Sequence, residues 1–139
     1  MNYRKNLERT ERRNQRLARE DAAGKLTSRA PDLMDLQIEI DETPRGNKVG
    51  GTRYIRRVVL AQAPALFEVP CSEPKCEEGG YDMTREILYA LASRRTLFEG
   101  QHACAGRCSA GECNRVLHYV ATAKYRQDQD ASTPPLRAG

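Results

Sequence analysis

The 139-residue sequence contains no tryptophan and only two phenylalanines, and aromatic residues make up 6% of it. A chain of this length has room for one domain plus tails. With so few large aromatic side chains, its hydrophobic core must be small, and small cores are commonly supplemented by a disulfide or a bound metal ion. The sequence therefore predicts one small domain that needs such a cross-link.

The sequence also lacks an apolar run near the roughly 18 residues that cross a membrane. The basic residues at the N-terminus are followed by no apolar stretch, so this segment does not resemble a secretory signal. We therefore expect a cytoplasmic protein without membrane contact. Cysteines stay reduced in the cytoplasm, and five of them, an odd number, favour metal binding over a set of disulfides.

The motifs of several enzyme classes are missing as well. The sequence contains no Gly-x-Ser-x-Gly nucleophile turn, no phosphate-binding loop and no dinucleotide-binding glycine pattern. It also has no Cys-x-x-Cys redox pair and no zinc-deaminase signature. We therefore expect a protein that is not an enzyme.

What the sequence does contain is a pair of similar cysteine clips. "CSEPKC" occupies residues 71–76 and "CSAGEC" occupies residues 108–113. In each clip, four residues that include a turn former separate the two cysteines. Four thiolates from two such loops can build a closed, tetrahedral zinc site that contributes directly to folding. The clips thus predict a structural zinc ion.

Five cysteines compete for these four positions. An iron–sulfur cluster and redox-active or unliganded thiols are the alternatives to zinc. The spacing matches neither common ferredoxin run, which argues against the cluster. The clips are similar in a general way to zinc-ribbon and treble-clef modules, which serve many functions. Because the two clips are similar, we predict that the zinc ligands are Cys71, Cys76, Cys108 and Cys113. Cys104 is the alternative to Cys108.

Hydrophobic periodicity predicts an α+β fold. The segment 2–23 is rich in helix formers and predicts an N-terminal helix. Apolar residues at helical spacing predict a second helix at about 82–98, with Gly100 just past its end. Strands are predicted within 31–41 and 53–62 and at 115–125. We expect a small antiparallel sheet of three to four strands, with the 82–98 helix packed on it and the zinc site as a staple.

Composition divides the chain into four segments. Residues 1–24 form a basic helical arm, and residues 25–52 form a linker that contains a short strand. Residues 53–126 make up the zinc-stabilised α+β domain. The polar, proline-containing tail at 127–139 is predicted to be disordered.

Basic residues are concentrated at the N-terminus. The net charge is +4, but residues 1–30 hold nine Lys and Arg against four acidic residues, a net charge of +5 that leaves −1 for the rest. Such an asymmetry is typical of an arm that contacts a polyanion or an acidic protein surface. The candidate nucleic-acid ligands lie in this arm and in the predicted strand at 53–62: Arg4, Lys5, Arg9, Arg12, Arg13, Arg16, Arg19, Arg56 and Arg57.

We expect the protein to bind nucleic acid, with RNA favoured over DNA, or to bind a nucleoprotein machine such as the ribosome or the transcription apparatus. Phosphate contacts by the arm give affinity without sequence specificity, and Tyr54 is a candidate for stacking on a base. The alternative is a zinc-stabilised protein-interaction adaptor without nucleic-acid contact, in which the N-terminal helix docks on a protein partner. The four acidic residues interleaved in the arm favour this alternative.

Overall fold

The computed structural model describes residues 2–44, 52–73, 76–77, 79–108 and 111–126, without the side chains of residues 2–5, 52, 108 and 112. Most of the expected loop at 42–52, and the tail at 127–139 that we expect to be disordered, lie outside the described residues.

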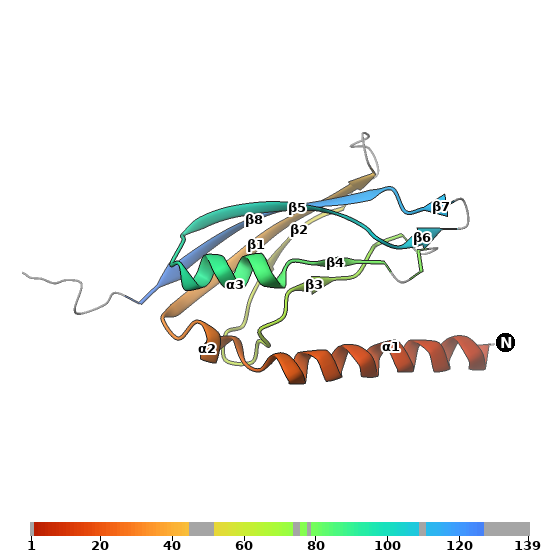
Figure 1. Ribbon diagram of the computed structural model, residues 1–139, viewed down its shortest axis with the longest axis horizontal. Coiled ribbons are helices and arrows are strands. Elements are labelled where there is room, and N and C mark those ends of the chain that lie inside the picture. The colour runs from red at the N-terminus through yellow and green to blue at the C-terminus, as the bar shows by residue number, and fades with distance from the viewer. Residues whose placement is uncertain (1, 45–51, 74–75, 78, 109–110, 127–139) are drawn as a thin grey trace, which may run out of the picture.

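A four-stranded antiparallel sheet with strand order β2-β1-β8-β5 forms the centre of the molecule (Figure 1). Its strands are β1 (Leu33–Pro44), β2 (Thr52–Arg57), β5 (Leu97–Ala103) and β8 (Arg115–Tyr125). The expected α+β class and antiparallel sheet are confirmed, and β8 occupies the predicted residues. β1 is longer than the predicted short strand, and it lies in the interior of the sheet between β2 and β8.

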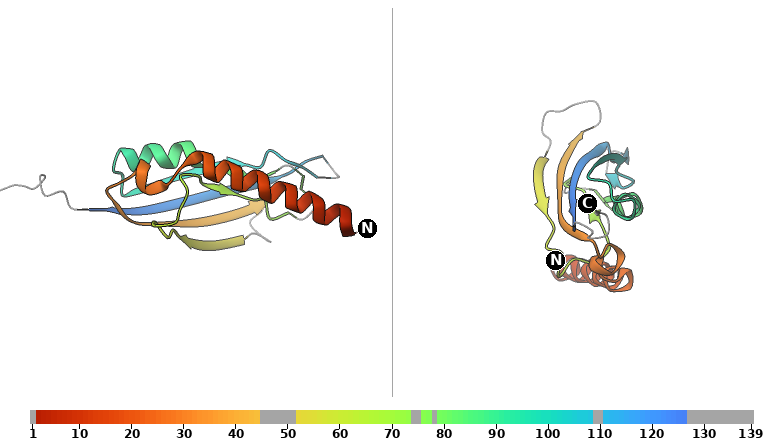
Figure 2. Two further views of the ribbon diagram at one scale, coloured as in Figure 1. Left: turned by 90° about the horizontal axis from the view of Figure 1, so that it is seen from below. Right: turned by 90° about the vertical axis from the view of Figure 1, so that its left-hand side faces the viewer.

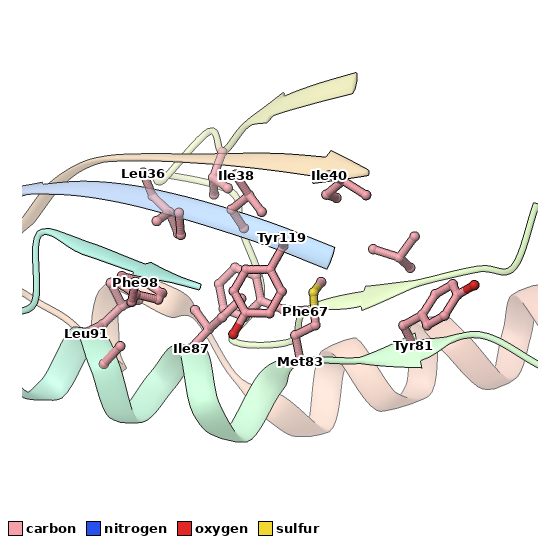
Figure 3. Close-up of a cluster of buried hydrophobic side chains, with 14 of the residues drawn as sticks. Leu36, Ile38, Ile40, Phe67, Tyr81, Met83, Ile87, Leu91, Phe98 and Tyr119 are labelled. Atoms are coloured by element: carbon pink, nitrogen blue, oxygen red, sulfur yellow. The ribbon is translucent and has the colours of Figure 1, made fainter. Parts of the chain in front are cut away.

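The two central strands bury alternate side chains on one face of the sheet. Leu36, Ile38 and Ile40 of β1 are fully buried, and Tyr119 of β8 lies opposite Ile40 in the register (Figure 3). Each of the buried aliphatic side chains stabilises the fold by about 1.5–3 kcal/mol. The period-two pattern of these strands follows from the opposite orientation of successive side chains.

The helix α3 (Thr84–Ala92) covers this buried face. Met83, Ile87 and Leu91 recur every four residues and are buried against the sheet (Figure 3). This spacing places them on one side of the helix. The packed helix expected between the two cysteine clips is therefore confirmed.

α3 ends earlier than the sequence predicts because Arg94 adopts a φ of 55°, which stops a helix. The Arg94 guanidinium pairs with Asp32 and lies 5.0 Å from the centre of the Tyr125 ring. The residues expected to complete the helix form β5 instead. Gly100, interpreted as a helix stop, leaves room in β5 for Tyr119, since a Cβ at this position would lie 2.6 Å from its ring.

The remaining elements flank the sheet. α1 (Asn2–Ala23) fills the predicted N-terminal helix and is followed by α2 (Leu26–Arg29). β3 (Glu68–Val69) pairs with β4 (Tyr81–Asp82), and β6 (Arg107–Cys108) pairs with β7 (Gly111–Glu112). Both α3 and the β3–β4 hairpin lie on one side of the sheet, and α1 runs beside them as the outermost element (Figures 1 and 2).

Candidate functional site

Four cysteine thiols converge near the β6–β7 end of the molecule. The Sγ atoms of Cys71, Cys76, Cys104 and Cys113 all lie within 4.8 Å of one another. The Cys71–Cys113 and Cys76–Cys104 sulfur pairs are each 3.7 Å apart, too far for a disulfide. A metal ion bound tetrahedrally at about 2.3 Å from each thiolate sets the sulfurs about 3.8 Å apart. The cluster can therefore hold one metal ion.

The ends of the strands position these four thiols. The first two cysteines lie in the loop between β3 and β4, Cys104 directly follows β5, and Cys113 lies shortly before β8. The Cys104 N–H donates to the Arg115 carbonyl at 2.9 Å, and the Cys113 N–H donates to the Gly106 carbonyl at 3.0 Å. A metal ion at this point would fasten the β3–β4 hairpin to the paired strands β5 and β8.

Two glycines permit the loops to approach each other closely. A Cβ at Gly79 would lie 2.3 Å from the Cys76 sulfur and 2.6 Å from the Cys104 sulfur. A Cβ at Gly106 would lie 2.4 Å from the Cys76 sulfur and 2.5 Å from the Gly79 Cα. No side chain fits at such distances. Neither glycine was predicted as a site residue, although their positions shortly after a cysteine in "CEEGG" and "CAG" were a usable signal.

Backbone N–H groups point at two of the sulfurs. The Cys104 sulfur accepts from the N–H groups of Gly80 at 3.3 Å and Gly106 at 3.4 Å, and the Cys71 sulfur accepts from the Glu73 N–H at 3.5 Å. Such donors stabilise a thiolate over a thiol. The loops thus present donors to sulfur as a metal–thiolate site requires.

The thiols differ in their ionisation without a metal. Burial raises the pKa of Cys71 to about 12 and also raises the pKa of Cys76. Burial opposes ionisation of Cys104 too, but the N–H groups of Gly106 and Gly80 outweigh it and lower the pKa of this thiol. Cys104 is therefore easier to ionise than Cys71 and Cys76, and the charge of a bound metal would ionise its neighbours.

A buried carboxylate supports the first cysteine loop. Glu42, near the end of β1, is the only charged side chain in the described residues that is buried. Its Oε2 accepts hydrogen bonds from the Tyr81 hydroxyl at 2.7 Å and from the N–H of Ser72, next to Cys71, at 3.1 Å. Burial and the carboxylate raise the pKa of Tyr81, which keeps its hydroxyl a donor. The continued alternation of β1 was the signal for this residue, which the sequence analysis missed.

The structure brings together the alternative ligand set. Three of the clustered cysteines, Cys71, Cys76 and Cys113, belong to both predicted sets, and the fourth is Cys104. Cys108 lies in β6, but its side chain is not among those described. Among the described side chains, Cys104 thus completes the cluster, and the β6–β7 hairpin lies between it and Cys113 along the chain.

The arm presents its basic side chains on one face of α1. Since each residue advances about 100° around a helix, five arginines fall within about 120° of its circumference. All five are exposed, and their side chains are described, whereas those of Arg4 and Lys5 are not. We refer to this surface as the basic face of α1, which consists of Arg9, Arg12, Arg13, Arg16 and Arg19.

Two members of the basic face have ionic contacts in the described structure. Arg19 binds Glu68 of β3, with an Nη2–Oε1 distance of 2.9 Å, and Arg16 lies 4.0 Å from Glu20 one turn away. The Arg19 contact ties the C-terminal half of α1 to the β3–β4 hairpin. Outside the basic face, α1 carries Leu7 on the opposite side and Leu17 about 40° from Arg13. These leucines are 50% and 46% exposed.

The two arginines predicted in β2 point to opposite faces of the sheet. Arg56 lies opposite Ile38, whose side chain is on the buried face, whereas Arg57 faces outward and donates to the Gln37 side chain at 3.0 Å. Tyr54 shares the face of Arg56 and is 40% exposed. The structure therefore does not gather Arg56 and Arg57 into one patch.

Within the described residues, no helix combines the length and apolar character needed to span a membrane. Comparisons of the chain with protein-family models, with curated proteins and with solved structures found no match.

Proposed function

We propose that this protein binds nucleic acid through the basic face of α1 and that a zinc ion held by four cysteines stabilises its fold. One observation carries the proposal: five exposed arginines share one face of a helix that lies at the edge of the molecule. The guanidinium group is always charged and forms paired hydrogen bonds with phosphate. A row of such groups suits a polyanion better than it suits a small substrate.

Zinc is the metal that suits the cysteine cluster best. Four thiolates around one centre select zinc or iron over the cations that prefer oxygen ligands. The 3.7 Å sulfur–sulfur distances fit a single ion, since the iron and sulfide atoms of a cluster would hold the thiolates further apart. Four protein ligands leave no position for water or substrate. The zinc ion therefore has a structural role.

Salt dependence tests the nucleic-acid proposal. Binding of fluorescently labelled RNA, and then DNA, is measured by anisotropy between about 50 and 200 mM salt. The variant R12Q/R13Q/R16Q removes three charges from the basic face. We expect weaker binding and a salt slope smaller in magnitude by about 2 to 3, because each phosphate contact contributes about 0.7–0.9 to the slope.

A control with the same loss of charge separates a site from a net-charge effect. R53Q/R95Q/K124Q removes three exposed basic side chains outside the candidate nucleic-acid ligands. We expect it to bind almost as tightly as the unmodified protein. Equal weakening by both triple variants, or no binding by the unmodified protein, would contradict the proposal.

The exposed leucines of α1 favour a second candidate function, that of a protein-interaction adaptor. Leu7 and Leu17 are half exposed and lie outside the basic face, where a partner helix or groove can cover them. A pull-down after nuclease treatment distinguishes the candidates. Partners that survive digestion and disappear with the variant L7S/L17S support the adaptor.

A further inference from the structure

An open groove of about 540 Å³ lies between α3 and the junction of α1 with α2. Ala23 closes α1 at one side of the groove, Arg29 of α2 and Leu66 line it, and Arg85 and Tyr89 of α3 form the facing wall. In Figure 1 these elements border one another at the end of the molecule away from the β6–β7 hairpin. The groove is therefore separate from the cysteine cluster.

The side chains of the groove combine positive charge with an exposed aromatic ring. Arg29 and Arg85 are exposed, and neither has an ionic partner among the described residues. Tyr89 is 71% exposed and lies four residues after Arg85, so both project from the same face of α3. No acidic residue lines the groove. An aromatic face beside two cations is how proteins bind unstacked bases and their phosphates.

The basic face of α1 leads into this groove. Ala23, which lines the groove, lies 4, 7 and 11 residues after Arg19, Arg16 and Arg12. These intervals place all four residues on one side of the helix, over a length of about 16 Å at 1.5 Å per residue. The arginines of α1 and the groove thus form one continuous path.

Three carboxylates border the path, and all are engaged. Glu20 lies 4.0 Å from Arg16, Glu68 is bound by Arg19, and Asp82 accepts a hydrogen bond from the Thr84 N–H at 3.0 Å. The positive side chains along the path, Arg12, Arg16, Arg19, Arg29 and Arg85, outnumber these three acids. The path therefore keeps a net positive charge.

We propose that the groove and the basic face of α1 form one binding site for single-stranded nucleic acid, with a base stacked on Tyr89. Phosphates lie against Arg29 and Arg85 in the groove and against Arg12 and Arg16 on α1. A single strand is required because a paired, stacked base cannot offer its flat face to the tyrosine. This inference rests on the proposed nucleic-acid function and names its ligand class and its stacking residue.

Substitution of the tyrosine tests the inference. Binding of the full chain to a labelled 15-nucleotide oligouridylate is compared with binding to an RNA duplex of the same length. Y89A is expected to weaken single-strand binding about 5- to 100-fold, because stacking on an aromatic ring contributes this much per base. Y89F, which keeps the ring, is expected to bind like the unmodified protein.

Two further variants serve as controls. L97A removes an exposed side chain on β5, outside the groove and outside the candidate nucleic-acid ligands, and is expected to leave binding unchanged. R29Q/R85Q is expected to reduce the salt slope by about 1.4, since each single-strand phosphate contact contributes about 0.7. Y89A is expected to keep the original slope, because it removes no charge.

The outcomes separate the inference from the proposed function. If the unmodified protein binds RNA but Y89A and L97A behave alike, or if the duplex binds as tightly as the single strand, the groove assignment is wrong and the proposed function stands. Absence of any binding overturns both. Displacement of the oligonucleotide by a glutamate-rich peptide of equal charge, at equal concentration, would assign the groove to an acidic protein segment instead.

Discussion

At the scale of single residues, the cysteine cluster depends on positions without side chains as much as on its thiols. Gly79 and Gly106 allow two loops to pass within van der Waals contact of the Cys76 sulfur. Glu42 of β1 then fixes the backbone next to Cys71 through the Ser72 N–H. The cysteines supply the donor atoms, and these three residues supply the geometry.

Substitution of Gly106 by alanine is expected to disrupt the cluster. The new Cβ would lie 2.4 Å from the Cys76 sulfur, so a loop must move and the tetrahedron must open. We expect loss of bound metal and destabilisation by more than about 2 kcal/mol, in the range of overpacked core substitutions. Metal analysis and urea denaturation of G106A provide the measurements.

Gly24 offers a matched control. Its φ of 79° disfavours alanine, but nothing lies within 4 Å of the new Cβ. G24A is therefore expected to cost only about 1 kcal/mol and to keep the metal. Retention of one metal equivalent by both variants would mean that close packing at Gly106 is not needed for the site.

At the scale of elements, α3 owes its position to one apolar side. Ile87 is fully buried against the sheet, whereas Tyr89, two residues away, is 71% exposed. We expect I87A to lower the free energy of unfolding by about 2–5 kcal/mol through loss of contacts and a cavity. Y89A is expected to change it by less than about 0.5 kcal/mol.

Chemical denaturation of both variants provides the comparison. Comparable destabilisation by I87A and Y89A would contradict the assignment of Ile87 to the buried side of α3 and of Tyr89 to the exposed side. The measurement also tests whether Y89A remains folded, which is required before its effect on nucleic-acid binding can be assigned to stacking.

The elements that follow a strong periodicity could be predicted from the sequence. α1 and β8 occupy the predicted residues, because an uninterrupted run of helix formers and a long alternation leave no competing structure. The end of α3 and the whole of β5 could not be predicted from the sequence. They depend on the left-handed conformation of Arg94 and on the packing of Gly100 against Tyr119. Both are tertiary effects that periodicity does not report.

The cysteine cluster could be predicted from the sequence only in part. Three of its members appear in both ligand sets derived from the spacing of the clips. The position of Cys104 depends on the end of β5, a strand that the sequence did not predict. Without β5, symmetry was the only guide, and it favoured Cys108.

At the scale of the whole molecule, the cluster closes the end of a thin fold. It links the β3–β4 hairpin to the central sheet at the end opposite the α1–α2 junction. Removal of the metal by a chelator is therefore expected to destabilise the protein by several kcal/mol, because site formation and folding are coupled. Thermal unfolding with and without chelator measures this loss.

Acid is expected to have the same effect as the chelator. The metal binds thiolates, and the pKa of Cys71 and of Cys76 is raised in the metal-free protein, so protons compete with the metal for sulfur. Metal affinity therefore falls as the pH falls and rises as the pH rises. Metal retention and unfolding temperature that do not depend on pH or chelator would contradict a structural metal.

The central claim is that Cys71, Cys76, Cys104 and Cys113 hold one zinc ion. The most direct test is the metal content of the unmodified protein, C104S and C108S, each purified without added metal. We predict one equivalent of zinc in the unmodified protein and in C108S, and none in C104S. Zinc retained by C104S but lost from C108S, or a coloured protein that contains iron, would contradict the account.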